Sequence, residues 1–131
     1  MQSNTNYYTG IASEYLVLSM LYRMEINACM CIGNTKSVDI LIRKQDNTAI
    51  TLDVKAVRGY SSLIVNNVRA EEHHYVCFVT YNSKFSDVNE LPEFFIVPCK
   101  DVLKIQKNFN GQKRVFKKDL LIYKDKWNYI S

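Results

Sequence analysis

Apolar residues near the start of the chain recur every three or four positions. They are Ile11, Leu16, Val17, Leu18, Met20, Leu21 and Met24. This period predicts an amphipathic helix over residues 9–25. Thr9 stands where the pattern begins, and threonine is a preferred N-cap residue, so we expect it to cap this helix.

The centre of the chain shows short runs of β-branched and aromatic residues bounded by polar turns, which predict strands. The predicted strands are residues 27–32, 38–44, 49–57, 74–81 and 93–98. Only the polar stretch 45–48 separates the second run from the third. This spacing indicates a hairpin loop, and therefore an antiparallel pair of strands.

The remaining segments are less regular. Residues 58–72 and 82–91 have loop compositions, and residues 100–107 are typical of a short helix. Within the last part of the chain, residues 120–123 suit either a strand or a helical turn. The order of these elements predicts one domain over residues 1–131, a mixed α/β sandwich around one central sheet.

Composition narrows the class of protein. A chain of 131 residues, 47% hydrophobic and 23% charged, is typical of one soluble globular domain. No apolar run approaches the roughly 18 residues of a membrane span, so we expect no membrane partner. The polar residues 1–10 do not have the pattern of a signal peptide, and we expect a cytoplasmic protein.

The cysteines add to this picture. They are Cys29, Cys31, Cys77 and Cys99. Their spacing is not that of a zinc site, so we expect small buried thiols in a reducing compartment.

Positive charge is concentrated towards the C-terminus. Residues 100–131 hold nine lysines and arginines against three acids, whereas residues 1–99 hold eight against ten. This distribution suits an anionic partner, nucleic acid before membrane. Lysines on a solvated helix face and hairpin would give the same count, so both interpretations stay open at this point.

Two predicted strands carry charged residues inside apolar runs, V-D-I-L-I at 38–42 and L-D-V-K-A at 52–56. Because side chains alternate along a strand, Asp39 shares a face with Leu41. For the same reason Asp53 and Lys55 share a face of the next strand. The predicted hairpin allows these two faces to become one.

Charged groups on one side of a largely buried sheet are costly unless they are paired or bind a metal. Two close carboxylates repel each other, and a divalent cation removes that conflict. Mg²⁺ (or Mn²⁺) suits such oxygen ligands, polarises a phosphate and lowers the pKa of a bound water. Lys55 would then stabilise charge that develops on the phosphate. Glu14, at the edge of the apolar face of the predicted helix, is expected to reach the same site.

Each of these residues alone has an ordinary structural explanation, as a hydrogen-bonded strand end, an exposed pair or a surface side chain. Their joint order is more informative: a helical Glu, a strand Asp, a hairpin and an Asp-x-Lys strand. The adjacent His73 and His74 would face opposite ways in a strand, so we expect a strand-entry pair rather than a shared metal site. Trp127 is expected to anchor the core.

This ordered set resembles the PD-(D/E)XK nuclease superfamily, and within it the small Holliday-junction-resolvase-like and bacterial PD-(D/E)XK endonuclease-like domains. The segments on which this resemblance rests are G-I-A-S-E at 10–14, G-N-T-K-S-V-D-I-L-I at 33–42, L-D-V-K-A at 52–56, F-F-I-V-P-C at 94–99 and Y-K-D-K-W at 123–127. The resemblance spans nearly the whole chain. It implies a restriction-endonuclease-like three-layer sandwich, in which helices flank a central mixed sheet of about five strands.

Residue by residue, the resemblance implies that Glu14 is the helix acid, that Asp39 and Asp53 bind the metal together with Glu14, and that Lys55 is the catalytic lysine. Two positions depart from the family pattern. Val38 stands where the name motif has proline, and Asp53 is the shorter acid where many members have Glu, which would shift the metal. The resemblance also implies a homodimer.

Further residues are candidates for contacts to a nucleic-acid backbone. They are Lys36, Ser37, Arg58, Lys113, Arg114 and Lys117. The first two precede Asp39, Arg58 follows the Asp-x-Lys strand, and the others belong to the basic C-terminal part of the chain.

The sequence thus predicts a Mg²⁺-dependent endonuclease that hydrolyses phosphodiester bonds of DNA, with branched or junction DNA as the favoured substrate. A small chain leaves little room for reading a sequence, so a separate specificity subunit is compatible with this hypothesis. The alternative is a non-catalytic nucleic-acid-binding or assembly domain on the same fold. A metal-dependent cleavage assay distinguishes the two.

Overall fold

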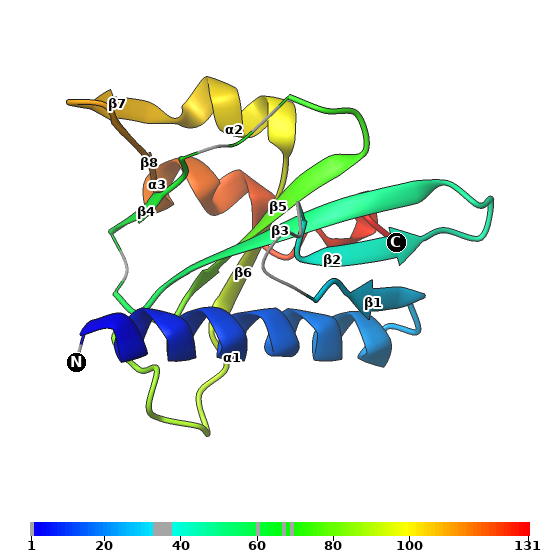
Figure 1. The fold of residues 1–131 in the computed structure, drawn as a ribbon, viewed down its shortest axis with the longest axis horizontal. Coiled ribbons are helices and arrows are strands. Elements are labelled where there is room, and N and C mark those ends of the chain that lie inside the picture. Colours follow the sequence, from blue (N-terminus) through cyan, green and yellow to red (C-terminus); the bar gives the residue numbers. More distant parts are fainter. Residues whose placement is uncertain (1, 33–37, 60, 67, 69) are drawn as a thin grey trace.

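A computed structural model describes residues 2–32, 38–59, 61–66, 68 and 70–131, with side chains from Thr5 onwards (Figure 1). The helices are α1 (Gln2–Arg23), α2 (Cys99–Ile105) and α3 (Lys117–Leu120), with 3₁₀ turns η1 (Leu121–Tyr123) and η2 (Trp127–Tyr129). The strands are β1 (Ala28–Met30), β2 (Ile40–Arg43), β3 (Ala49–Val57), β4 (Ser62–Ile64), β5 (His74–Thr80), β6 (Glu93–Pro98), β7 (Lys107–Phe109) and β8 (Gln112–Phe116).

Five strands form the central sheet in the order β1-β2-β3-β5-β6. Strands β3 and β5 are parallel, and the other neighbours are antiparallel. The predicted hairpin is confirmed, since β2 and β3 pair antiparallel across the polar loop at 45–48. The bounds predicted for β3 and β6 agree with the structure, because polar turns and Pro98 mark the ends of these apolar runs.

Helix α1 covers one face of this sheet (Figure 1). Val17 and Leu21 of the helix are fully buried against Ile40 and Leu52 of the sheet. Ser13 is buried in the same layer, where its hydroxyl donates to the Thr9 carbonyl and pairs with the Tyr81 hydroxyl at 2.8 Å. This polar group is therefore satisfied inside an otherwise apolar interface.

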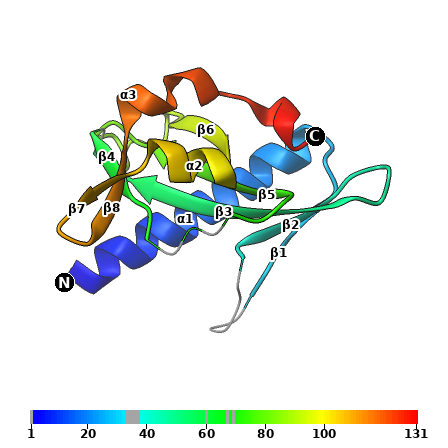
Figure 2. The same ribbon diagram turned by 90° about the horizontal axis from the view of Figure 1, so that it is seen from above.

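The opposite face is covered by α2, α3 and a second, three-stranded sheet of order β4-β8-β7 (Figure 2). Phe78 and Phe95 of the central sheet pack there with Val115 and Leu120, all of them buried. The chain is thus an α/β sandwich whose central mixed sheet lies between helices, as predicted. In the described part of the chain, the helices include none with the length and apolarity to cross a bilayer.

Several predicted details are wrong. Helix α1 begins at Gln2, so Thr9 lies inside it, and its hydroxyl donates to the Thr5 carbonyl instead of capping the helix. The stretch 58–72 contains β4, and residues 107–116 form the β7–β8 hairpin. Strand β4 pairs with a partner far along the chain, as Leu63 does with Val115, so local periodicity gives little sign of it, whereas β7 and β8 form a local hairpin. For residues 120–123, where a strand and a helical turn were both expected as alternatives, the helical turn is confirmed.

The environment of the cysteines was predicted only in part. Cys77 and Cys99 are buried, whereas Cys31 is half-buried and Cys29 is exposed on the short edge strand β1. None of these four cysteines, all in the described part of the chain, forms a disulfide. Burial raises the pKa of the Cys77 thiol far above its usual range. The prediction for Trp127 is confirmed, since its ring packs on Phe94 with centroids 5.3 Å apart.

Candidate functional site

The pairing of β2 with β3 sets the position of the predicted acids. The register joins Ile40 to Leu52 and Leu41 to Thr51. Since paired residues share a face, Asp53 and Lys55 lie on the face of Leu41 and Thr51, away from α1. The predicted merging of the two strand faces is therefore confirmed.

Asp39 lies directly before β2 and takes over the strand pairing where β2 begins. Its backbone N–H donates to the Leu52 carbonyl at 3.2 Å. Its Oδ2 accepts the Val54 N–H at 2.8 Å. The carboxylate thus takes the place of the backbone carbonyl that a neighbouring strand would offer to this N–H. In the described residues β2 pairs with β3 only between Ala49 and Leu52. Beyond Leu52, this edge of β3 is therefore open in the described residues, meaning that it is no longer paired with β2. The half-buried Asp39 is fixed at the point where the edge of β3 opens.

Asp53 contacts a histidine that the sequence predicts only as part of a strand-entry pair. Its Oδ2 lies 3.3 Å from Nε2 of His74, the first residue of β5. His74 is buried, and its Nδ1 is 2.7 Å from the Thr51 hydroxyl. The parallel register joins Thr51 to His74, and this brings the imidazole diagonally next to Asp53. Sequence spacing could not reveal the contact, because it depends on the alignment of β3 with β5.

Lys55 follows on the same face of β3 and is half-buried. Within the described residues, none of the hydrogen bonds or ion pairs involves its ammonium group. Lys55 also lines an open cleft with the N-terminal turns of α1, the end of β3, strand β4 and Arg114. Lys55 therefore lies beside a solvent-accessible hollow that can admit an anion.

Glu14 comes from a different layer. It is half-buried on α1, which packs against the sheet face that carries Leu52, opposite to the Asp53–Lys55 face. Over the described ranges, no three His, Cys, Asp or Glu side chains form a group that could hold a metal ion. Mg²⁺ commonly uses one or two protein carboxylates with substrate phosphate and waters, so the oxygen donors of Asp39 and Asp53 fit its chemistry.

The predicted nucleic-acid contacts fall into distinct groups. Lys36 and Ser37 lie outside the described residues. Arg58 and Arg114 both line the cleft beside Lys55. Lys113 is exposed on β8. Two of the predicted contacts, from separate parts of the sequence, thus meet beside the candidate catalytic lysine.

Lys117 is instead tied into the fold. Its ammonium group contacts Oε1 of Glu93 and donates to the Asn82 side-chain carbonyl at 2.8 Å. Lys124 binds the other Glu93 oxygen at 3.1 Å. Burial raises the pKa of Glu93, but hydrogen bonds from Lys117, Asn82 and Lys124 outweigh it and lower this pKa to about 2. Part of the C-terminal positive charge therefore neutralises an internal acid.

Comparison with known proteins finds similarity in structure only. No protein-family model and no curated protein matches the sequence. Among solved structures, the chain is similar to that of a bacterial homing endonuclease, I-Ssp6803I, with a TM-score of 0.64 and 12% sequence identity. The match covers 93% of this chain and 88% of that one. At this identity the two chains are shown to share a fold.

Proposed function

We propose that this protein is a Mg²⁺-dependent endonuclease of the PD-(D/E)XK type that hydrolyses phosphodiester bonds in DNA. The observation that carries the proposal is the joint placement of Asp39, Asp53 and Lys55 where the edge of β3 opens. The fold shared with a bacterial homing endonuclease supports the proposal. That protein is a nuclease, and the shared fold covers 93% of this chain and 88% of that one.

In this proposal Asp39 and Asp53 hold Mg²⁺ or Mn²⁺, and Glu14 would contribute a further acid from the α1 side of the sheet, past the end of β2. The bound ion would supply Lewis-acid chemistry, polarising the phosphate and lowering the pKa of a coordinated water. The hydrogen bond from Val54 N–H fixes one oxygen of Asp39. His74, packed against Asp53 and Thr51, restricts the orientation of the Asp53 carboxylate.

Lys55 acts on the substrate. Its ammonium group would donate to a non-bridging oxygen of the scissile phosphate and stabilise the negative charge that develops there. Hydrolysis forms one bond between a water oxygen and phosphorus and breaks one bond from phosphorus to a bridging oxygen. Removal of one such charge-stabilising donor typically slows an enzyme about 10²- to 10³-fold.

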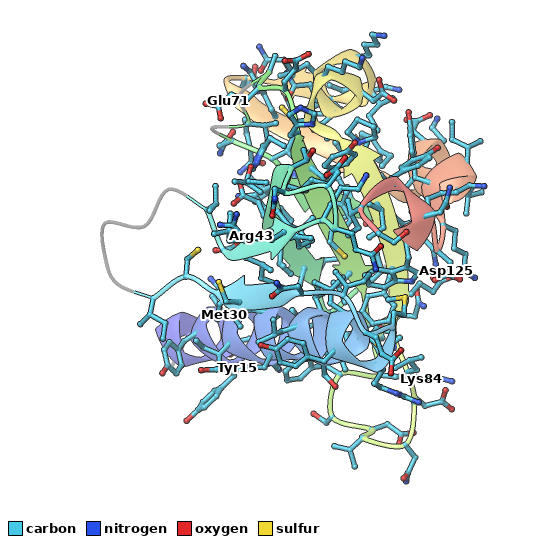
Figure 3. All side chains as sticks on the ribbon, turned by 90° about the vertical axis from the view of Figure 1, so that its right-hand side faces the viewer. Tyr15, Met30, Arg43, Glu71, Lys84 and Asp125 are labelled. Atoms are coloured by element: carbon cyan, nitrogen blue, oxygen red, sulfur yellow. The ribbon has the colours of Figure 1, made fainter. Side chains whose placement is uncertain are left out.

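A homodimer belongs to the same proposal, and the exposed side of α1 supports it. Tyr8, Tyr15 and Tyr22 recur every seven residues and are each more than half exposed, and Tyr15 projects away from the body of the molecule (Figure 3). Over its 22 residues α1 carries only two charged side chains, Glu14 and Arg23. An aromatic face depleted in charge is typical of protein interfaces.

Three further parts of the proposal rest on the sequence: junction or branched DNA as the substrate on chain size and the resemblance, a separate specificity subunit on chain size, and a cytoplasmic location on the spacing of the cysteines. The substrate is best approached by supplying the purified protein with supercoiled, single-stranded and four-way-junction DNA. Mass measurement in solution, with Tyr15→Lys as the interface variant, tests the dimer.

The decisive experiment for the activity compares four proteins with Mg²⁺, with Mn²⁺ and with EDTA. They are the wild type, Asp53→Asn, Lys55→Met and the surface control Lys104→Met. We expect metal-dependent cleavage by the wild type and the control, and loss of at least 10²-fold in the two site variants, with DNA binding retained.

Cleavage that survives Asp53→Asn or Lys55→Met would refute the assignment of the site. Absence of cleavage of all three substrates with either metal, while DNA is still bound, would favour the non-catalytic binding domain. Lys104 is a suitable control because it lies on α2 with a side chain that is 75% exposed, and its ion pair with Asp101 spans 3.9 Å.

A further inference from the structure

The cleft beside Lys55 has the lining of an anion site. Its volume is about 450 Å³, and it lies between the start of α1, the end of β3, strand β4 and strand β8. The lining residues are Thr5, Asn6, Thr9, the segment 55–59, the segment 62–64 and Arg114. Three of them, Lys55, Arg58 and Arg114, are cationic, and none is acidic. A concave surface lined by charge of one sign concentrates ions of the opposite sign.

Arg58 is held in a defined position at one wall. Its Nε donates to the Thr9 hydroxyl at 2.7 Å, and a terminal nitrogen donates to the Thr5 carbonyl at 3.3 Å. Its guanidinium also stacks 3.9 Å from the centroid of the Phe85 ring. These contacts use two of the five N–H groups of the Arg58 guanidinium, so further donors remain for a ligand. The partners in these contacts are uncharged, so they do not neutralise the positive charge of Arg58.

Arg114 is held in the same way at another wall. Its Nε donates to the Gln112 side-chain carbonyl and a terminal nitrogen donates to the Ser62 hydroxyl, both at 2.9 Å. Both partners are neutral. This contrasts with Lys117 and Lys124, whose charges are matched by Glu93. Glu93 therefore balances the charges of Lys117 and Lys124, whereas the neutral partners of Arg114 leave its positive charge unbalanced at the cleft.

We propose that this cleft binds a backbone phosphate of a nucleic-acid strand, a few nucleotides from the phosphate at Lys55. This inference rests on the proposed function, since it takes Lys55 as the residue at the scissile phosphate. Strand β3 rises about 3.3 Å per residue, so the backbone of its last residue, Val57, lies about 7 Å beyond that of Lys55, and Arg58 follows directly. A span of about 7 to 10 Å corresponds to two to three nucleotides of one DNA strand, at about 3.4 Å each.

Two preset guanidinium groups suit a phosphate because their planar N–H donors pair with its oxygens. Contacts of this kind fix the register of the strand without reading its sequence. The cleft would thereby position the strand so that one particular phosphate reaches Lys55. The proposed ligand is the phosphodiester backbone of a nucleic acid. Single-stranded and duplex DNA both present this backbone, so the experiment tests each of them.

The test measures binding in EDTA, where no cleavage occurs. Fluorescently labelled single-stranded and duplex DNA are titrated with the wild type, Arg114→Gln and the control Lys104→Gln over a series of NaCl concentrations. We expect Arg114→Gln to bind roughly tenfold more weakly at low salt, with the slope of log affinity against log salt reduced by about one. The control should match the wild type.

Arg58→Lys serves as a second variant, because it keeps the charge while losing the planar donors. We expect it to weaken binding with little change in the salt slope. A thermal melt of each variant separates misfolding from lost contacts. If Arg114→Gln, folded as shown by its melt, binds both DNAs with the affinity and slope of the wild type, the inference is overturned.

The result is independent of cleavage. Wild-type protein that never cuts, combined with weakened binding by Arg114→Gln, would refute the proposed nuclease and retain the phosphate site. Wild-type protein that cuts, combined with unchanged binding by Arg114→Gln, would retain the nuclease and refute the phosphate site.

Discussion

Substitution of Glu93 by glutamine tests how the fold uses its C-terminal lysines. Glu93 begins β6, and one of its oxygens contacts Lys117 while the other lies 3.1 Å from Lys124. Asn82 and Thr80 donate to the first oxygen at 2.9 and 3.3 Å. The carboxylate therefore joins the central sheet to α3 and to the segment after η1. Glu93→Gln keeps the shape of the side chain and removes its charge.

The magnitude follows from the pKa of this carboxyl group. Hydrogen bonds from Lys117, Asn82 and Lys124 outweigh the raising effect of burial and lower it from 4.5 to about 2. A change of that size corresponds to about 3 kcal/mol of the free energy of unfolding. The side chain is 23% exposed, so solvent screening reduces this value, and we expect about 2 kcal/mol.

The sign is fixed by linkage. Because the pKa is lower in the folded than in the unfolded state, the stabilisation is fully present above about pH 4.5 and is lost as the pH falls through about 2. Urea unfolding of wild type and Glu93→Gln is therefore measured at pH 7, 4.5, 3.5 and 2.5. The difference between the two proteins should be about 2 kcal/mol at pH 7 and shrink steadily below pH 4.5.

Glu90→Gln is the matched control. Glu90 is 51% exposed, and its pair with Lys84 spans 3.8 Å, so its loss should cost less than about 0.5 kcal/mol. A difference for Glu93→Gln that stays constant from pH 7 to 2.5, or that equals the control, would refute the reasoning. In that case Lys117 and Lys124 would be available to an anionic partner, as the sequence first suggested.

The remaining predictions concern packing and thiol reactivity. Phe78 is fully buried on the α2–α3 side of the sheet, so Phe78→Ala should lower the free energy of unfolding by about 3–5 kcal/mol in urea titrations. Val88 is 92% exposed, and Val88→Ala should change it by less than about 0.5 kcal/mol; equal effects would contradict the assigned core. In native protein at pH 8, a thiol reagent should modify Cys29 within minutes and Cys77 only on unfolding, because burial raises the pKa of Cys77 and shields it. Mass mapping of the labelled peptides checks this order, and early labelling of Cys77 would count against the buried position of β5.

Much of the central sheet could be predicted because its signals are local. The β2–β3 hairpin needs only two apolar runs and the short polar loop between them, and the register then follows from the alternation of buried and polar positions. The same alternation placed Asp53 and Lys55 on one face before any tertiary contact was known. The helix of residues 9–25 was identified for the same reason, although its polar first turns, residues 2–8, gave no amphipathic signal.

The tertiary structure decided which distant segments meet. The parallel alignment of β3 with β5 places His74 on Asp53, and nothing between residues 53 and 74 fixes that alignment locally. The pairing of β4 with β8 brings Arg114 to the cleft that holds Lys55 and Arg58, and Glu93 determines which lysines are neutralised. Local periodicity depends on a few neighbouring residues, whereas these contacts depend on how all layers pack together. The sequence alone therefore determined the strand that carries the acid–lysine pair, and packing determined what surrounds it.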